Sequence, residues 1–135
     1  MKRTALTLAL TFAVGIVVGV VGNHVLNAQQ QPVKRTVLQK VDLGDKEGIM
    51  YLAELAPGAT TGKHYHPGYD FYYAIEGSWI LEIEGKPSVT AKPGDVGHQP
   101  PKQVHNVINA SQTAPVKLLG FLLAEKGQPF STPVK

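Results

Sequence analysis

The sequence predicts an all-β fold class, with about eight short strands closed into a small sandwich or barrel, most often a jelly roll. Three observations support this. After residue 35 the apolar residues fall into short runs that are separated by Gly, Pro, Asp and Asn. The 135 residues include 14 Gly and 10 Pro, which is typical of a chain with many turns. Beyond the N-terminal segment, no stretch has the 3.6-residue apolar period of a helix.

The N-terminal segment, residues 1–28, has the pattern of a signal peptide or signal anchor. Lys2 and Arg3 precede a run from Ala5 to Gly22 that carries no charge, and Ala28 is a candidate cleavage position. A run of this length fits a signal peptide that is removed or a helix that stays in the membrane, with a buried core helix as the remaining alternative. The positive residues would stay in the cytoplasm, so we expect the rest of the chain to be exported, to the periplasm or beyond. Any membrane contact would then be made only by an uncleaved N-terminal segment.

The rest of the chain is long enough for one domain. We expect a polar linker at residues 29–35, a β-barrel domain at residues 36–127 and a C-terminal tail at residues 128–135. In chain order, the predicted strands are near Thr36–Val41, Ile49–Leu55, Phe71–Glu76, Trp79–Glu84, Ser88–Ala91, Val96–Gln99, Val104–Asn109 and Val116–Glu125. Tight turns at Gly77, Gly85 and Pro93-Gly94 separate several of them, because Gly supplies a positive φ and Pro presets a turn.

Composition excludes several classes of protein. The chain has no cysteine, which excludes a disulfide scaffold, a thiol nucleophile, an iron–sulfur cluster and a cysteine-based zinc site. The formal net charge is +3, but without Lys2 and Arg3 only 11 basic side chains face 10 acidic ones. A domain so close to neutral lacks the basic surface that binds nucleic acid, so we expect no nucleic-acid partner.

The most informative residues are histidines. His64 and His66 are two apart, so on an extended strand both side chains leave the same face and can meet one metal ion. Asp70 follows a Pro-Gly bend and could add a carboxylate, and His105 could approach from a neighbouring strand. Three imidazoles and a carboxylate suit one divalent transition metal, such as Mn, Fe, Co, Ni, Cu or Zn, and leave open positions for water or substrate.

The spacing around these residues resembles the two motifs of the cupin superfamily. For the first motif, Gly58 is followed by five residues, the His64-x-His66 pair, three residues, Asp70, six residues and Gly77. The resemblance implies a small single-domain barrel with one metal held by His64, His66 and His105, and with Asp70 as the fourth ligand.

The second motif begins at Gly94, which is followed by five residues and then Pro100. His105 and Asn109 then follow at the spacing of the motif. Together the two motifs extend from Gly58 to Asn109, which is about half of the domain expected to be exported.

Two positions depart from the cupin motifs. Asp70 stands where the family usually has Glu, and its shorter side chain either ligates the metal or orients a ligand or water beside it. A site of three histidines alone is therefore the alternative. Lys102 stands where the second motif has Gly, so the loop before His105 must avoid a positive φ or tolerate it at a cost.

Two further residues are candidate catalytic groups. His98 is most simply a satisfied pocket or core histidine, but in the cavity its imidazole would suit a proton shuttle. Tyr72 shares strand parity with Asp70 and either lines the cavity or packs in the core. The remaining large aromatics are interpreted as core or dimer-interface residues: Phe71, Tyr73 and Trp79.

No arginine can be named as a substrate anchor, since the only arginines are Arg3 and Arg35 and neither is near the motifs. This weakens the case for a strongly anionic substrate held by a guanidinium group. Lys63 or Lys102 could serve as a point charge instead.

These residues and the resemblance together predict an exported metal-binding protein. We expect a metal-dependent enzyme, dioxygenase-, isomerase- or decarboxylase-like, acting on a small oxygen-bearing molecule such as a diketone, catechol, flavonol or keto acid. The alternative is a non-catalytic module that binds a metal or small ligand, and a third interpretation is a structural dimer with a vestigial site. The resemblance also implies a homodimer, for which Val116–Glu125 could supply a pairing edge.

Overall fold

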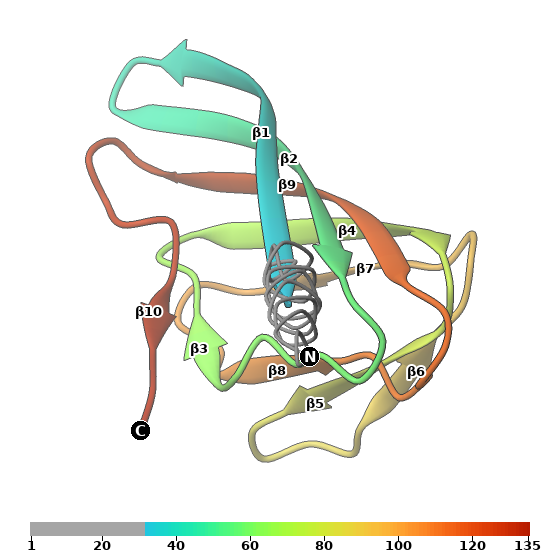
Figure 1. Ribbon diagram of the computed structural model, residues 1–135. Helices are drawn as coiled ribbons and strands as arrows, with labels where there is room; N and C mark the ends of the chain where they lie inside the picture. The colour runs from blue at the N-terminus through green and yellow to red at the C-terminus, as the bar shows by residue number, and fades with distance from the viewer. Residues whose placement is uncertain (1–31) are drawn as a thin grey trace, which may run out of the picture. The chain divides into compact units, whose positions relative to one another are not determined.

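The computed structural model describes residues 32–135, so the predicted signal or anchor segment lies outside the described residues. Every regular element from residue 32 onwards is a β-strand (Figure 1). Within the same residues no helix has the length and apolar character needed to cross a bilayer. The all-β prediction is confirmed.

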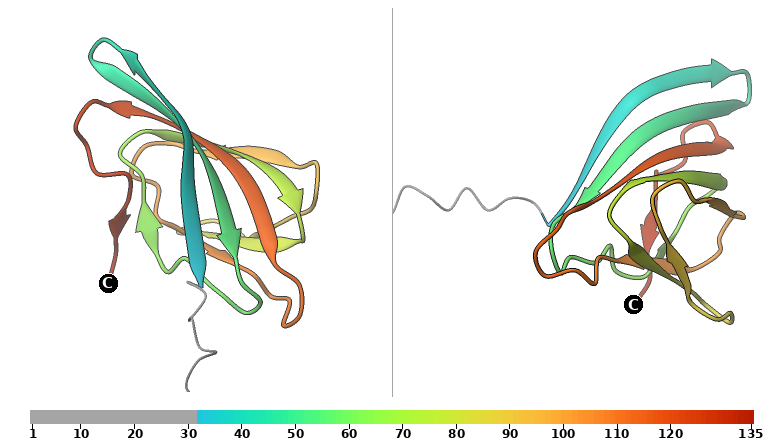
Figure 2. Two further views of the ribbon diagram at one scale, coloured as in Figure 1. Left: turned by 45° about the horizontal axis from the view of Figure 1, so that its top comes forward. Right: turned by 90° about the vertical axis from the view of Figure 1, so that its right-hand side faces the viewer.

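The strands form two five-stranded antiparallel sheets that pack face to face (Figures 1 and 2). The first sheet has the order β1-β2-β9-β4-β7, and the second has the order β10-β3-β8-β5-β6. Two packed antiparallel sheets with such crossed connections form a jelly roll. The strands are β1 (Val33–Leu43), β2 (Lys46–Leu55), β3 (His64–Tyr65), β4 (Tyr69–Glu76), β5 (Trp79–Ile83), β6 (Val89–Ala91), β7 (Val96–Gln99), β8 (His105–Ile108), β9 (Val116–Glu125) and β10 (Thr132–Pro133).

All eight predicted strands are present, and the two-residue strands β3 and β10 add to them. Strand β10 pairs with β3, so residues of the expected C-terminal tail belong to the barrel. Strand β1 begins at Val33, within the expected linker. The expected pairing edge is wrong, because β9 is hydrogen-bonded to β2 on one side and to β4 on the other.

Buried apolar side chains fill the space between the two sheets. Strands β2 and β9 alternate between buried and less buried residues, which is the period of a strand with one face on the core. The largest fully buried apolar side chains are Trp79, Leu55, Leu122 and Val116. They come from both sheets, so the core joins the two layers of the barrel.

Asn109 ties the end of β2 to the loop between β8 and β9. Its side chain is 1% exposed, and its Nδ2 atom donates to the carbonyl oxygens of Leu55 (3.3 Å), Ala56 (3.0 Å) and Ala114 (2.9 Å). This buried amide with satisfied donors joins two backbone segments, residues 55–56 and the loop at Ala114. These contacts are the structural role of the asparagine at the end of the second motif.

The outer face of the first sheet carries a row of large exposed apolar side chains. Tyr69, Phe71, Tyr73 and Ile75 alternate along β4 and are 43–47% exposed, and Val96 on the neighbouring β7 is 71% exposed. Phe71 and Tyr73 are therefore outside the core, in contrast to the buried Trp79.

Candidate metal centre

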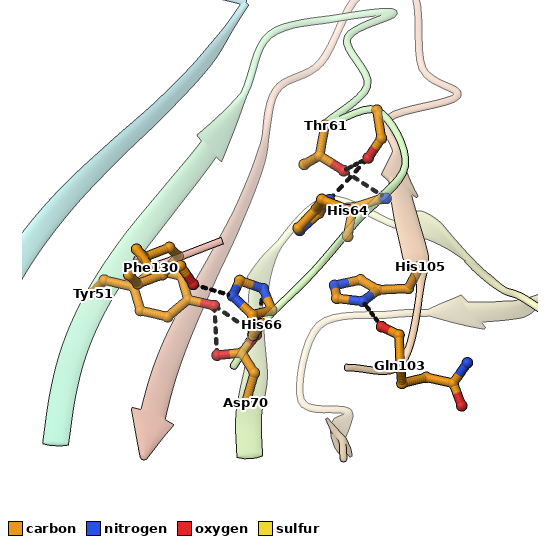
Figure 3. Close-up of polar contacts among 10 residues, drawn as sticks. Tyr51, Thr61, His64, His66, Asp70, Gln103, His105 and Phe130 are labelled. Atoms are coloured by element: carbon orange, nitrogen blue, oxygen red, sulfur yellow. Dashed lines mark hydrogen bonds and ion pairs between the residues drawn. The ribbon is translucent and has the colours of Figure 1, made fainter. Parts of the chain in front are cut away.

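Three histidine side chains meet between the sheets (Figure 3). His64 lies in β3, His66 follows that strand directly, and His105 is the first residue of β8. His64 and His105 are register partners, which places their side chains on one face of the sheet. One ring nitrogen from each histidine can be chosen so that all three lie within 4.8 Å of one another. The spacing of the His-x-His pair therefore produces the arrangement that a shared metal ion requires.

Each imidazole is oriented by a hydrogen bond from its Nδ1 atom to a backbone carbonyl oxygen. These bonds join His64 to Gly62 (2.8 Å), His66 to Phe130 (2.8 Å) and His105 to Gln103 (3.0 Å). A carbonyl oxygen only accepts, so the ring proton lies on Nδ1 and the Nε2 lone pair of each neutral ring is free. Such a donor set fits a divalent transition metal, with the carbonyls fixing the rings from outside.

Burial keeps these rings uncharged. The three histidines are 3–7% exposed. Burial lowers the pKa of His66 to about 3 and that of His105 to about 4, and it also lowers the pKa of His64. All three are neutral at pH 7, which is the form that binds a metal without first losing a proton.

Asp70 lies beside the three histidines, but its carboxylate oxygens are not part of the group of ligand atoms that lie within 4.8 Å of one another. Its two oxygens share one hydrogen bond from the Tyr51 hydroxyl, at 3.0 and 2.9 Å, and its Oδ2 is 3.3 Å from Nε2 of His66. Since Nε2 has no proton, two acceptors at this separation need a proton or a cation between them. Burial raises the pKa of Asp70 to about 7, although the Tyr51 hydroxyl and the charge of Arg35 lower it.

Tyr51, which sequence reasoning missed, reaches Asp70 across a glycine. A Cβ atom at Gly120 would lie 2.0 Å from Cζ of the Tyr51 ring. Because Gly120 on β9 has no side chain, the Tyr51 ring can cross over β9 and extend from β2 to β4. A lone tyrosine on the buried face of an apolar strand was the only sequence signal for this role.

Arg35 is the second residue that sequence reasoning missed. Its partner in β2 is Ala53, which faces the core, so Arg35 points to the same side and lines the pocket that contains the histidines. Its guanidinium carbon lies 4.1 Å from the ring centroid of Phe130 and 5.8 Å from that of Tyr51. The expectation that Arg35 is not near the motif residues is wrong, because the β1–β2 hairpin brings it to the pocket from a distant part of the sequence.

The two candidate catalytic residues have different surroundings. His98 is exposed, with its ring centroid 5.6 Å from that of Phe71 on the outer face, while the next residue, Gln99, is buried and lines the pocket. Strand alternation thus excludes His98 from the cavity and gives that place to Gln99. Tyr72 lines the pocket and also packs against Trp79, with ring centroids 4.9 Å apart.

The loop before His105 tolerates the predicted strain. Lys102 has a φ of 63°, and it is the only non-glycine residue in the described part of the chain with a positive φ. Its backbone nitrogen donates to the carbonyl oxygen of His66 at 2.8 Å. The left-handed conformation therefore connects the loop to a candidate ligand.

A family model described as "Cupin domain" matches residues 51–122. This range is more than half of the chain and includes the three histidines and Asp70. The chain belongs to the cupin family. Over 53 residues this cupin is 38% identical to the polyketide synthase CurC of Streptomyces cyaneus, a stretch that covers 38% of this chain and 34% of that protein. The matched stretch is thus about a third of the curated relative's length.

Solved structures have the same fold. A cupin-like protein from Thermotoga maritima is 25% identical, with a TM-score of 0.60 over 76% of this chain and 74% of that chain. Oxalate oxidase in complex with the substrate analogue glycolate is 18% identical, with a TM-score of 0.62 over 79% of this chain and 57% of that chain. At these identities the likeness to oxalate oxidase concerns the fold alone.

Proposed function

We propose that this cupin holds one divalent transition metal ion through Nε2 of His64, His66 and His105, and that it is a metal-dependent enzyme. The observation that supports this best is the set of three buried, neutral imidazoles whose Nδ1 atoms are all engaged by carbonyls. When bound, such an ion polarises a substrate oxygen and, if it is redox-active, exchanges electrons with it. The substrate would be a small oxygen-bearing organic molecule, in a dioxygenase-, isomerase- or decarboxylase-like reaction.

Asp70 is proposed as a proton-handling neighbour of the metal rather than as a fourth ligand. The Tyr51 hydroxyl occupies both carboxylate oxygens, and Oδ2 faces Nε2 of His66 at 3.3 Å. In this position Asp70 can take up a proton from a bound substrate and return it, while Tyr51 keeps the carboxyl group from rotating. Apolar residues such as Leu81 and Leu118 line the same pocket and exclude bulk water.

Metal content of the purified chain tests the site. We expect about one transition metal ion per chain by elemental mass spectrometry, and loss of that metal in His64→Ala and in His105→Ala. Asp70→Ala should weaken metal affinity by roughly 10–100-fold if the carboxylate acts beside the ligands. His98→Ala is the matched control, because this exposed histidine should leave the metal in place. Stoichiometric metal in His105→Ala would refute the proposed donor set, and complete loss in Asp70→Ala would make Asp70 a ligand.

Turnover distinguishes an enzyme from a binding module. The metal-loaded chain is offered a panel of 1,2-diketones, catechols and keto acids with and without O₂, and products and oxygen consumption are followed. Conversion that depends on the metal and is lost in His66→Ala supports catalysis. Binding of panel members without conversion would support the non-catalytic alternative.

We also propose export and a homodimer. The charge-free run after Lys2 and Arg3 supports export, and N-terminal sequencing of the protein recovered from outside the cytoplasm tests it. The exposed apolar row along β4 supports a second copy as the partner of this face. Light scattering should give twice the mass of one chain, and Phe71→Glu should lower the measured mass to that of a single chain. A monomeric wild-type chain would refute this interface.

A further inference from the structure

We propose that the ligand of this site is a small organic carboxylate with at least one further oxygen, and that Arg35 is the residue that binds its carboxylate. This inference rests on the proposed function, since it names the class of molecule that the metal centre receives. It starts from the polar groups that line the histidine pocket and have no partner within the protein.

Arg35 has no acidic partner in the part of the chain that the structure describes. None of the ion pairs found within residues 32–135 includes it. Asp70, the one carboxylate lining the pocket, is engaged by Tyr51 instead. The Phe130 ring lies close to the guanidinium group and attracts it as a cation. A cation held in this way has donors free for a carboxylate, and its planar fork matches that group.

Two buried donors point to the same kind of ligand. Gln99 is 4% exposed and Trp79 is 1% exposed, and both line the pocket. Among residues 32–135, neither Nε2 of Gln99 nor Nε1 of Trp79 has a hydrogen-bond partner. A buried donor without a partner is costly, so a ligand that brings acceptors is favoured there over an apolar one. Gln99 and Asp70 are register partners, so this amide lies beside the proposed metal centre.

The entrance and the size of the pocket agree with a small anion. Arg35 and His64 also border an adjoining groove that contains Lys63 and no acidic residue. Two cations at one opening attract an anion from solution. The cavity itself measures about 40 Å³, which is room for only about three water molecules by the usual volume per buried water. The part of the ligand inside must therefore have few atoms.

A pair of isosteric probes tests the inference. Lactate carries a carboxylate and a hydroxyl group, and lactamide replaces the carboxylate with a neutral amide of the same shape. The full metal-loaded chain is titrated by calorimetry with both compounds and with acetate, oxalate and pyruvate. We expect at least one carboxylate to bind and lactate to bind at least about 10-fold more tightly than lactamide, which is the effect of a charge-assisted hydrogen bond.

The variants identify Arg35 as the source of this preference. Arg35→Gln should weaken lactate binding by about 10–100-fold and leave lactamide binding unchanged, and Arg35→Lys should restore part of the affinity. Gln99→Leu should weaken both compounds by about 2–10-fold. Lys34→Gln is the matched control, because the neighbouring Lys34 pairs with Glu54. Thermal melts confirm that each variant is folded.

The outcomes separate this inference from the proposed function. Lactamide binding as tight as lactate binding, an Arg35→Gln variant that keeps the wild-type lactate affinity, or no binding of any carboxylate would each overturn the role of Arg35. Metal content is measured on the same samples, and the titrations are repeated after the metal has been stripped. A chain that takes up no metal but still prefers lactate through Arg35 would refute the metal centre and support the carboxylate site.

Discussion

Replacing Tyr51 with Phe tests whether one hydroxyl group controls the carboxylate beside the histidines. The ring keeps its shape, so no cavity forms, and only the hydrogen bond to the two oxygens of Asp70 is lost. In the metal-stripped protein, burial raises the pKa of Asp70 from its ordinary value of 3.8 to about 7. The native carboxyl group is therefore protonated below about pH 7 and ionised above it.

Because Asp70 titrates, the free energy of unfolding that is lost in Tyr51→Phe should depend on pH. A hydrogen bond to a buried ionised group contributes about 1.5–3 kcal/mol, and one to a neutral group about 0.5–1.5 kcal/mol. Tyr51→Phe should thus lower the free energy of unfolding of the metal-stripped protein by about 1 kcal/mol at pH 5.5 and by about 2 kcal/mol at pH 8.5. The loss grows as pH rises because only the ionised wild-type carboxylate gains the stronger bond.

Urea denaturation at the two pH values measures this difference. Tyr72→Phe is the control, since the Tyr72 hydroxyl forms no hydrogen bond within residues 32–135 while its ring also lines the pocket. Equal losses for Tyr51→Phe at pH 5.5 and 8.5, or a loss no larger than that of the control, would refute the proposed pairing of Tyr51 with an ionisable Asp70.

Three further predictions concern the backbone. Lys102→Gly should raise the free energy of unfolding by about 1 kcal/mol because it relieves a positive φ, whereas Lys102→Ala should give no such gain in the same melts. Removal of residues 128–135 deletes the carbonyl that orients a histidine, and zinc titration should show roughly 10–100-fold weaker affinity while the β signal in circular dichroism persists. Gly120→Ala should cost about 1–3 kcal/mol because the new Cβ would lie 2.0 Å from Cζ of Tyr51. Gly48→Ala should cost less in urea denaturation, because its Cβ would come no closer than 2.8 Å to Phe121 and 3.1 Å to Val41.

The strands could be predicted because their sequence is locally consistent. Apolar runs ended by Gly and Pro predicted eight strands, and the His-x-His pair predicted two side chains on one face. Strands β3 and β10 have two residues each, so their sequences are too short to show an alternation of apolar and polar residues. The position of β9 inside its sheet depends on which strands cross between layers, and this topology is absent from local sequence.

The parts of the site that sequence reasoning missed come from distant segments. Arg35 and Phe130 lie near opposite ends of the described chain, and the fold places the guanidinium carbon 4.1 Å from the centroid of the Phe130 ring. Their roles follow from register and strand order, which spacing within a motif cannot reveal. His98, which lies outside the pocket, differs from Gln99 by one position, and that single step reverses the face of a strand.

The hydrogen bond from His66 to the carbonyl of Phe130 has a consequence for how the protein acquires metal. During synthesis, Phe130 emerges after every strand from β1 to β9 has been made. His64 and His105, which are register partners, are also separated in sequence by strands β4 to β7. The carbonyl that orients His66 is thus added only after these strands, so the fully oriented centre forms late. We expect the ion to enter a finished barrel rather than to guide its folding, so metal supply should govern occupancy and leave the folding rate unchanged.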